Sequence, residues 1–436
     1  MRKRVPAVGL LFIVLLALGV TATTATSTPD VIAPDAVIDQ FPLPSQSAWP
    51  QDIVGDASGN LWFAQAGNDH IGRLVPAQAT PDTSNGFSEF PLAQGAWPHG
   101  IDARNGTVWT AEFWFDGLAI VSGGIVTEYL SLDQDVHPSD VAIAGDGSVW
   151  FTESGGNALG HFWPLTATVD QILLPTPDSS PLALTLDQSG NVWFTAASAN
   201  QIGVYRPAQI TMTVFSLPTA DSYPTSLVVD SQGIVWFTEG MGNKIGRLDP
   251  TTGVISEYPL PTGGAFPEGM ALDGHGRLWF AENFADKIAS FDMTTHVFTE
   301  YPLAGGAMPE GVTVLNDGAI WFTQGGTDSL GRLTLQPTST STPTATPSPT
   351  WMTTPTATTT RTATVTITPT ASGSPIPTVT NTPALTATAT ETPLLSPTVT
   401  PTATSTLPTT RTPTPSPTPT AERNRRLYLP IIVSQY

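Results

Sequence analysis

The fold is decided by the stretch PTSLVVDSQGIVWFTEGMGNKIGRLDPTTGVISEYPLP at residues 224–261. Variants of this stretch occur seven times along the chain, and each contains a tryptophan that is usually followed by Phe-Thr or Phe-Ala. The tryptophans lie 47, 41, 43, 43, 43 and 42 residues apart, at Trp62, Trp109, Trp150, Trp193, Trp236, Trp279 and Trp321. A period near 43 residues indicates a tandem-repeat architecture.

One repeat contains four short β-rich runs, which in the fifth copy are 226–229, 234–238, 244–248 and 254–258. The segments between them are rich in Gly, Asp, Asn and Pro, the residues that form tight turns. The second run, Ile-Val-Trp-Phe-Thr, is apolar on both faces, so each small sheet must be covered on both sides. Packing the repeats around a ring provides that cover, and four strands per repeat of this length are typical of a β-propeller blade. We therefore predict an all-β, seven-bladed β-propeller over residues 37–335.

The order of the fourth-strand motif predicts how the ring closes. The motif, of the type Val-Ile-Asp-Gln-Phe-Pro-Leu, first occurs at Val37–Leu43, before the first tryptophan, and no copy follows Trp321. The N-terminal segment should therefore supply the outer strand of the last blade, which leaves no blade unfinished.

The first residues have the pattern of an export signal. Arg2, Lys3 and Arg4 precede an apolar stretch of 14 residues, 7–20, which is short for a membrane span. We predict a signal peptide at residues 1–22, a secreted protein and no transmembrane helix in the mature chain. The chain has no cysteine, so it forms no disulfide.

The C-terminal part differs sharply in composition from the repeats. Residues 336–420 are almost wholly Thr, Pro, Ser and Ala, which predicts a disordered stalk in extended polyproline geometry, or else a plain disordered tail. Residues 421–436 combine three arginines with a brief apolar run and resemble a short tag that retains a protein at the cell surface.

The charge of the repeat region bears on its partners. Residues 23–335 hold 34 acidic and 8 basic side chains, a net charge of −26. Such a surface disfavours nucleic acid as a partner and does not exclude cations and cationic ligands. The alternative is that the acidity serves solubility. We predict a monomer that binds a small-molecule, peptide or glycan ligand.

The motifs within the repeat resemble those of a known family. Pro-x-Gly-(Ile/Met/Val), Asp-x-x-Gly, Leu-Trp-Phe-Thr-Glu, Asn-Lys-Ile-Gly-Arg and Glu-(Tyr/Phe)-Pro-Leu-Pro together are similar to the streptogramin B lyase family, also called virginiamycin B lyase-like, over residues 37–335. The resemblance implies a seven-bladed propeller. For the family enzyme it implies a Mg²⁺-dependent carbon–oxygen lyase that opens a cyclic depsipeptide at its ester by elimination.

The resemblance also implies a catalytic pair. His99 in Pro-His-Gly-Ile matches a catalytic histidine of the family, and Glu112 matches the glutamate of its blade. Both are equidistant from the turn of one hairpin, so we predict that they face each other. The family has histidine where this chain has Gln51, and glutamate where it has Trp97. The alternative is that His99 is a structural histidine of the channel.

Carboxylates and aromatic residues gather at the expected ends of the first two strands. Hard cations bind oxygen ligands, so Glu239, Glu268, Glu282 and Glu310 are the candidate ligands of a Mg²⁺ or Ca²⁺ cofactor. The alternative is that they are hydrated channel carboxylates without an ion. The residues before the first-strand prolines are predicted to wall a binding mouth, namely Trp49, Trp97, Tyr223 and Phe266.

Three functions remain open from the sequence. The first is an exported propeller that binds a ligand through an acidic channel mouth. The second is a lyase of the virginiamycin B type. The third is a structural or adhesive module displayed on a stalk.

Overall fold

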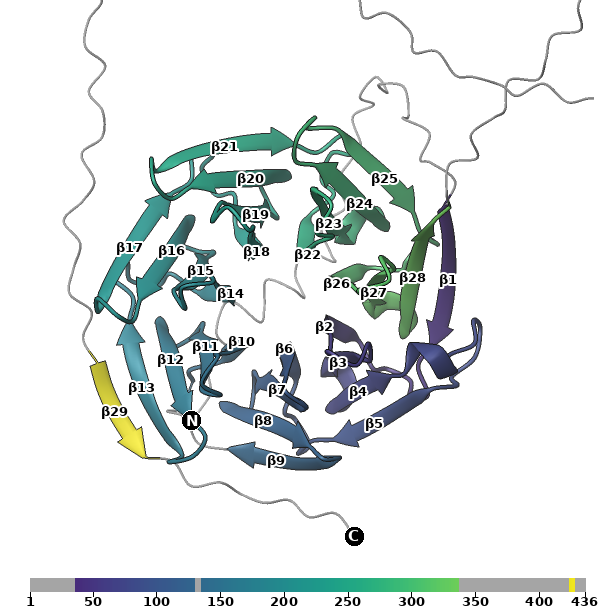
Figure 1. The fold of residues 1–436 in the computed structure, drawn as a ribbon, viewed down its shortest axis with the longest axis horizontal. Helices are drawn as coiled ribbons and strands as arrows, with labels where there is room; N and C mark the ends of the chain where they lie inside the picture. The colour runs from purple at the N-terminus through teal and green to yellow at the C-terminus, as the bar shows by residue number, and fades with distance from the viewer. Residues whose placement is uncertain (1–35, 130–134, 337–422, 428–436) are drawn as a thin grey trace, which may run out of the picture. The chain divides into compact units, whose positions relative to one another are not determined.

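The computed structural model describes residues 36–129, 135–336 and 423–427. Within these ranges the chain forms seven antiparallel sheets, six with four strands and one with five. Figure 1 shows the sheets arranged in a ring around a central axis, each running from an inner to an outer strand. The seven-bladed β-propeller predicted from the repeat is confirmed.

The strands of blades one to seven occupy four concentric positions (Figure 1). The innermost strands are β2 (Pro50–Gly55), β6 (Pro98–Arg104), β10 (Pro138–Ile143), β14 (Pro181–Leu186), β18 (Pro224–Val229), β22 (Pro267–Leu272) and β26 (Pro309–Val314). The second strands are β3 (Leu61–Gln65), β7 (Thr107–Glu112), β11 (Val149–Glu153), β15 (Val192–Ala196), β19 (Val235–Glu239), β23 (Arg277–Glu282) and β27 (Ile320–Gln324). The third strands are β4 (His70–Leu74), β8 (Gly117–Ser122), β12 (Ala158–Trp163), β16 (Gln201–Arg206), β20 (Lys244–Asp249), β24 (Lys287–Asp292) and β28 (Ser329–Leu335). The outer strands are β5 (Phe87–Pro91), β9 (Ile125–Tyr129), β13 (Thr168–Leu173), β17 (Thr211–Ser216), β21 (Val254–Pro259), β25 (Phe298–Pro302) and, in blade seven, β1 (Ala36–Pro42).

The N-terminal strand closes the ring, as the order of the motif predicts. β1 runs antiparallel to β28, so the first described strand of the chain completes the last blade. Phe41 of β1 is fully buried, with its ring centroid 4.9 Å from that of Trp321. Asp39 accepts a hydrogen bond from Arg332 Nη2 at 2.5 Å. The two ends of the propeller are therefore joined by backbone pairing, apolar packing and an ion pair.

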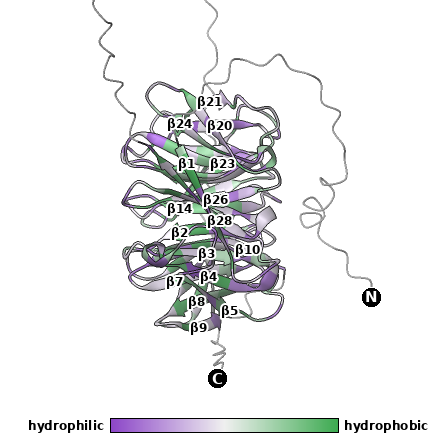
Figure 2. Cartoon of the chain, turned by 90° about the vertical axis from the view of Figure 1, so that its right-hand side faces the viewer, coloured by the Kyte–Doolittle hydropathy of each residue, from purple (hydrophilic) through white to green (hydrophobic). Residues whose placement is uncertain are grey.

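The repeated tryptophans form the core between blades. Trp236 of blade five is 2% exposed and lies 5.9 Å, between ring centroids, from Phe291 of blade six. Its indole Nε1–H donates to Asp230 Oδ2 at 3.0 Å, which anchors it to the first hairpin turn of its own blade. Trp62, Trp193 and Trp279 make the same indole hydrogen bond in their blades, whereas Nε1 of Trp321 has no partner among the described residues. Apolar and polar residues are interspersed over all the blades seen from the side (Figure 2).

One further strand lies outside blade three. β29 (Arg423–Leu427) pairs antiparallel with β13, with Thr168 opposite Leu427 and Ile172 opposite Arg423. The predicted signal peptide, the predicted stalk beyond residue 336 and the rest of the predicted C-terminal tag lie outside the described residues. Within the described ranges no helix has the length and apolar character needed to cross a membrane.

Candidate functional site

The first hairpin of each blade does not have the simple register expected from the sequence. Pro98, not His99, lies opposite Glu112, and Pro267, not Glu268, lies opposite Glu282. The register shifts after each of these prolines, as in a β-bulge, where one strand accommodates an extra residue. The predicted facing pairs were therefore wrong, because the bulge separates the residue after the proline from the end of the second strand.

Left-handed backbone shapes the loops that precede the first strands. The residue before each first-strand proline has a positive φ, between 42° and 55°, at Trp49, Trp97, His137, Ser180, Tyr223, Phe266 and Met308. A non-glycine residue in this region costs about 1–2 kcal/mol. Neighbouring blades hold the loops in place, since Asp328 accepts from the backbone N–H of Trp49 at 3.0 Å and Asp69 from that of Trp97 at 2.9 Å.

These loops and the loops after the second strands lie at the same end of the antiparallel blades, and we call this end the channel mouth. Trp49 and Trp97 are 38% and 37% exposed there, whereas Phe266 is buried and stacks on the exposed Phe284 with ring centroids 4.8 Å apart. Tyr223 is partly buried. Trp114, 41% exposed, belongs to the same end but was missed in the sequence; the Phe-Trp-Phe run after Glu112 is its only signal.

An acidic pair from two neighbouring innermost strands lies at the mouth. Glu268 of β22 and Glu310 of β26 are partly buried, and burial raises the pKa of both, that of Glu310 to about 8. The charge of Glu310 raises the pKa of Glu268 further. Trp49 Nε1–H donates to Glu310 Oε1 at 3.1 Å, which opposes the shift. The pair therefore retains a proton at neutral pH, so it can both donate and accept hydrogen bonds.

The other two predicted metal ligands lie elsewhere. Glu239 and Glu282 end the second strands of blades five and six, are fully buried, and have raised pKa values of about 7 and about 8 because of that burial. The structure thus brings Glu268 and Glu310 together and keeps Glu239 and Glu282 in their own blades. In the described part of the chain, no group of three or more His, Cys, Asp or Glu side chains is placed to hold a metal ion. The four glutamates therefore do not fit one Mg²⁺ site.

His99 is oriented by a blade other than its own. Its Nδ1 lies 3.0 Å from the carbonyl oxygen of Ser139 in β10, and because a carbonyl only accepts, Nδ1 carries the proton. Nε2 is left with its lone pair, and burial lowers the pKa of the imidazole, which keeps it neutral. Glu112 is fully buried and its carboxyl oxygens have no hydrogen-bond partner among the described residues. The structure therefore does not join His99 to Glu112.

Three aspartates of the innermost strands were missed by sequence reasoning. Asp52 Oδ2 accepts from the backbone N–H of Ile101 in the next blade at 3.1 Å, and Asp140 Oδ2 accepts from that of Leu184 at 2.8 Å. Asp102 makes the equivalent bridge from blade two to blade three. Burial raises the pKa of all three, that of Asp52 to about 6. Their hydrogen bonds link blades one to four. In the sequence, only their position after the first-strand proline distinguishes these aspartates.

Comparison with known proteins places this arrangement in a family. The family model described as "Virginiamycin B lyase family" matches residues 124–359. A virginiamycin B lyase from Nocardia farcinica (strain IFM 10152) is 29% identical over 115 residues, which cover 26% of this chain and only 38% of that relative. A solved streptogramin B lyase structure is 28% identical with a TM-score of 0.64, covering 69% of this chain and 98% of the other.

A second solved structure is similar to the same degree. It is a catalytically inactive histidine-to-alanine variant of virginiamycin B lyase from Staphylococcus aureus with quinupristin, 28% identical with a TM-score of 0.64, covering 69% of this chain and all of the other, 100%. Since the family model matches more than half of the chain, and the full propeller superposes on these lyases, the chain belongs to the virginiamycin B lyase family.

Proposed function

We propose that this propeller binds a small-molecule, peptide or glycan ligand at the channel mouth. The observation that carries the proposal is the placement of exposed aromatic side chains, Trp49, Trp97 and Trp114, at the same end of the ring as the acidic pair Glu268–Glu310. Aromatic walls with a few polar groups are typical of ligand sites, because the rings bury apolar surface while the polar groups fix the orientation.

The electrostatics restrict the kind of ligand. The net charge of −26 over residues 23–335 disfavours anions, whereas a neutral or cationic ligand meets no long-range repulsion. A carboxyl pair that holds one proton offers both a donor and acceptors to an amide, hydroxyl or amine. A ligand with apolar rings and such polar groups fits the mouth best.

Titration with quinupristin tests the proposal, since a related lyase was solved with that molecule. Isothermal calorimetry should detect binding that weakens in Trp49→Ala and Trp97→Ala. Leu165→Ala is the matched control, because Leu165 is 102% exposed in a turn between third and outer strands, at the other end of the ring. Binding that is unaffected by both tryptophan changes would exclude the mouth.

The second candidate function is elimination at an ester, as in the family enzyme. It is favoured by one observation: His99 presents an unprotonated Nε2 on a neutral imidazole. A base of this kind can remove the proton beside a carbonyl, a step usually worth about 10²–10⁴ in rate. Because the four glutamates do not form one metal site, we assign no step to Mg²⁺.

The location of the protein is part of the same proposal. The basic head and apolar stretch of residues 1–22 support export, and the Thr/Pro-rich composition of 336–420 supports display of the propeller on a stalk at the cell surface. A structural or adhesive role would use the same stalk without a ligand at the mouth. Detection of the mature N-terminus in culture medium or at the surface, by mass spectrometry, tests export.

A further inference from the structure

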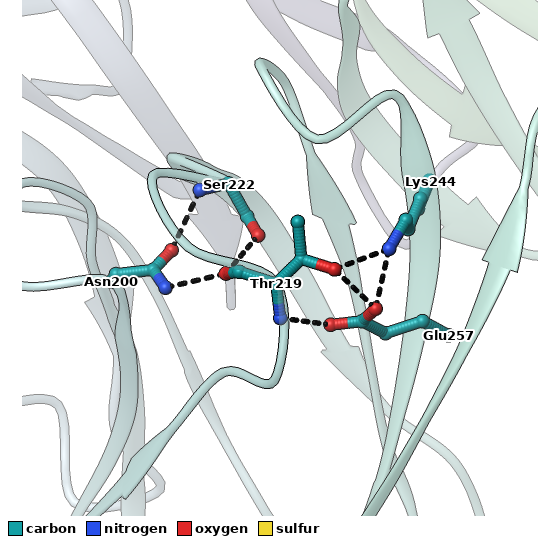
Figure 3. Close-up of polar contacts among 5 residues, drawn as sticks. All are labelled: Asn200, Thr219, Ser222, Lys244 and Glu257. Carbon is teal, nitrogen blue, oxygen red and sulfur yellow. Dashed lines mark hydrogen bonds and ion pairs between the residues drawn. The ribbon is translucent and has the colours of Figure 1, made fainter.

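Blades five and six neutralise a partly buried acidic residue of the outer strand in the same way. In blade five, the Glu257 carboxylate accepts from the backbone N–H of Thr219 at 2.9 Å, from its Oγ1 at 2.6 Å and from Lys244 Nζ at 2.5 Å (Figure 3). Lys244 begins β20 opposite Glu239, the last residue of the second strand. Lys244 therefore pairs with the outer-strand carboxylate, whereas both carboxyl oxygens of Glu239 have no hydrogen-bond partner among the described residues.

Blade six repeats this arrangement with its own residues. Glu300 accepts from the backbone N–H and Oγ1 of Thr262 at 3.1 and 2.8 Å, and from Lys287 Nζ at 2.5 Å. Lys287 lies opposite Glu282 in the β23–β24 register. In blades five and six, where both strands carry glutamate, the third strand thus supplies a lysine at the same position.

In blades one and three, a neutral side chain instead of a cation donates a hydrogen bond to the carboxylate. In each of them, one of the two glutamates is replaced by glutamine, so a neutral amide donates to the remaining carboxylate. Gln65 Nε2 donates to Glu89 Oε1 at 3.2 Å in blade one, and Gln171 Nε2 donates to Glu153 Oε2 at 2.6 Å in blade three.

Blade two keeps both glutamates but has neither the lysine nor the threonine that bind the outer-strand glutamate in blades five and six. Gly117 takes the lysine position opposite Glu112, and Ala93 takes the threonine position, where only its backbone N–H donates to Glu128 Oε1, at 2.6 Å. Glu112 and Glu128 are 0% and 1% exposed. Both oxygens of Glu112, like those of Glu239 and Glu282, have no hydrogen-bond partner within the described part of the chain. Blade two differs in that Oε2 of the outer-strand Glu128 has none either.

Such a pair requires a positive charge or a proton. Two buried carboxylates repel each other, and each buried oxygen without a donor carries a desolvation cost. Burial, and then the charge of the neighbouring Glu128, raises the pKa of Glu112 well above its ordinary range, and the charge of Asp69 adds to the shift. A hydrogen bond between the two groups needs a proton on one of them, whereas a cation at the lysine position would neutralise both.

We propose that Glu112 and Glu128 bind a hard divalent cation in blade two, at the position that the lysine Nζ takes in blades five and six. The three unpartnered oxygens are hard ligands, and a charge of +2 matches two carboxylates. Ca²⁺ fits better than Mg²⁺, because Ca²⁺ accepts irregular coordination and bidentate carboxylates, while Mg²⁺ retains its waters in a strict octahedron. Backbone carbonyls or water supply the remaining positions. This site is independent of the ligand proposed at the mouth.

Thermal unfolding of the full chain, first treated with a chelator and then titrated with Ca²⁺, tests the proposal. A cation bound to the folded state raises the melting temperature, and calorimetry should give one strong site. Glu112→Gln and Glu128→Gln should each remove the Ca²⁺-dependent rise. Gly117→Lys recreates the arrangement of blades five and six, so it should raise the melting temperature without Ca²⁺ and abolish the response to it.

Glu257→Gln serves as the matched control, because Glu257 holds the equivalent outer-strand position in blade five but is paired with Lys244, and it should keep the Ca²⁺-dependent rise. A rise that survives both Glu112→Gln and Gly117→Lys would overturn the site. The absence of any response to Ca²⁺ would also overturn the site. In that case the stability of the wild type should be measured at alkaline pH. A decline that is missing in Glu112→Gln would show that the pair holds a proton instead of a cation. If the glutamine variants do not fold, Gly117→Lys alone decides between these outcomes.

Discussion

The indole Nε1–H of Trp49 donates to Glu310 Oε1 at 3.1 Å and so links the loop before blade one to the innermost strand of blade seven. This bond lies where the two ends of the ring meet, on the inner side of the blade that β1 completes. An exposed aromatic residue is thereby attached to an acidic group whose pKa is raised by burial. The same hydrogen bond therefore connects the first and last blades and contacts the acidic pair of the mouth.

Removal of Val37–Pro44 should greatly destabilise the propeller. The deletion exposes the edge of β28 and removes Phe41 from the core it shares with Trp321. Phe41→Ala alone should cost about 3–5 kcal/mol, the usual result of deleting a buried aromatic side chain. Val37→Ala is the control, because Val37 is 43% exposed on the same strand. Unchanged melting temperatures for both the deletion and Phe41→Ala would contradict closure by β1.

Glu310→Gln should change how stability depends on pH. The folded pKa of Glu310 is about 8, above the ordinary value of 4.5, so the folded state binds more protons than the unfolded state between these values. Its contribution is complete below pH 4.5 and is lost as the pH rises towards 8, by at most about 1.4 kcal/mol per pH unit. Urea unfolding from pH 5 to pH 8 should show a shallower decline in the variant. Parallel profiles would mean that Glu310 ionises normally.

Of the four predicted ligands of a Mg²⁺ or Ca²⁺ cofactor, Glu268 and Glu310 are the two that lie together at the mouth, so a cation bound there should depend on this pair. We expect a Mg²⁺-dependent rise in melting temperature to disappear in Glu268→Gln, because a ligand of the folded state stabilises it. Glu282→Gln should retain the rise, since Glu282 is buried within blade six. If Glu282→Gln also removes the rise, or Glu268→Gln leaves it intact, the ion lies elsewhere.

His99→Ala should lower any ring-opening activity on quinupristin by about 10²–10⁴-fold, the usual contribution of a positioned base. Glu112→Gln should have little direct effect on the reaction, because no hydrogen bond joins Glu112 to His99. His275→Ala is the matched control, since His275 lies in an exposed hairpin turn at the other end of blade six. Mass spectrometry separates elimination, which leaves the mass unchanged, from hydrolysis, which adds a water. Activity that persists in His99→Ala would assign the base to another residue.

Gln51→His should raise a weak lyase activity. Gln51 follows the first-strand proline of blade one, the position that His99 has in blade two, and the family resemblance places histidines in consecutive blades. A second imidazole at the mouth would add a second proton-transfer group. The same mass-spectrometric assay measures the change, and unaltered turnover would show that the position does not take part.

The architecture was determined by the sequence itself. The spacing of the tryptophans, the turn residues between four short runs and the early copy of the fourth-strand motif predict seven blades closed by the N-terminal strand, and the strand order confirms them. These features are local, since turn chemistry and apolar pattern act within a few residues of the chain. Assignment of the motif tryptophans, such as Trp236, to the core between blades follows from the same pattern.

The tertiary structure alone decided which polar residues meet. The alternation of apolar and polar residues along a strand does not reveal the bulge after each first-strand proline. With this bulge, Glu268 lies near Glu310, whereas Glu282 stays within its own blade. His99 takes its partner from Ser139, 40 residues away, because the ring brings two innermost strands together. Gly117 lies opposite Glu112, where blades five and six have a lysine. This difference is apparent only when the three blades are compared in the structure. Contacts between blades depend on the radius and register of the ring, which no single repeat encodes.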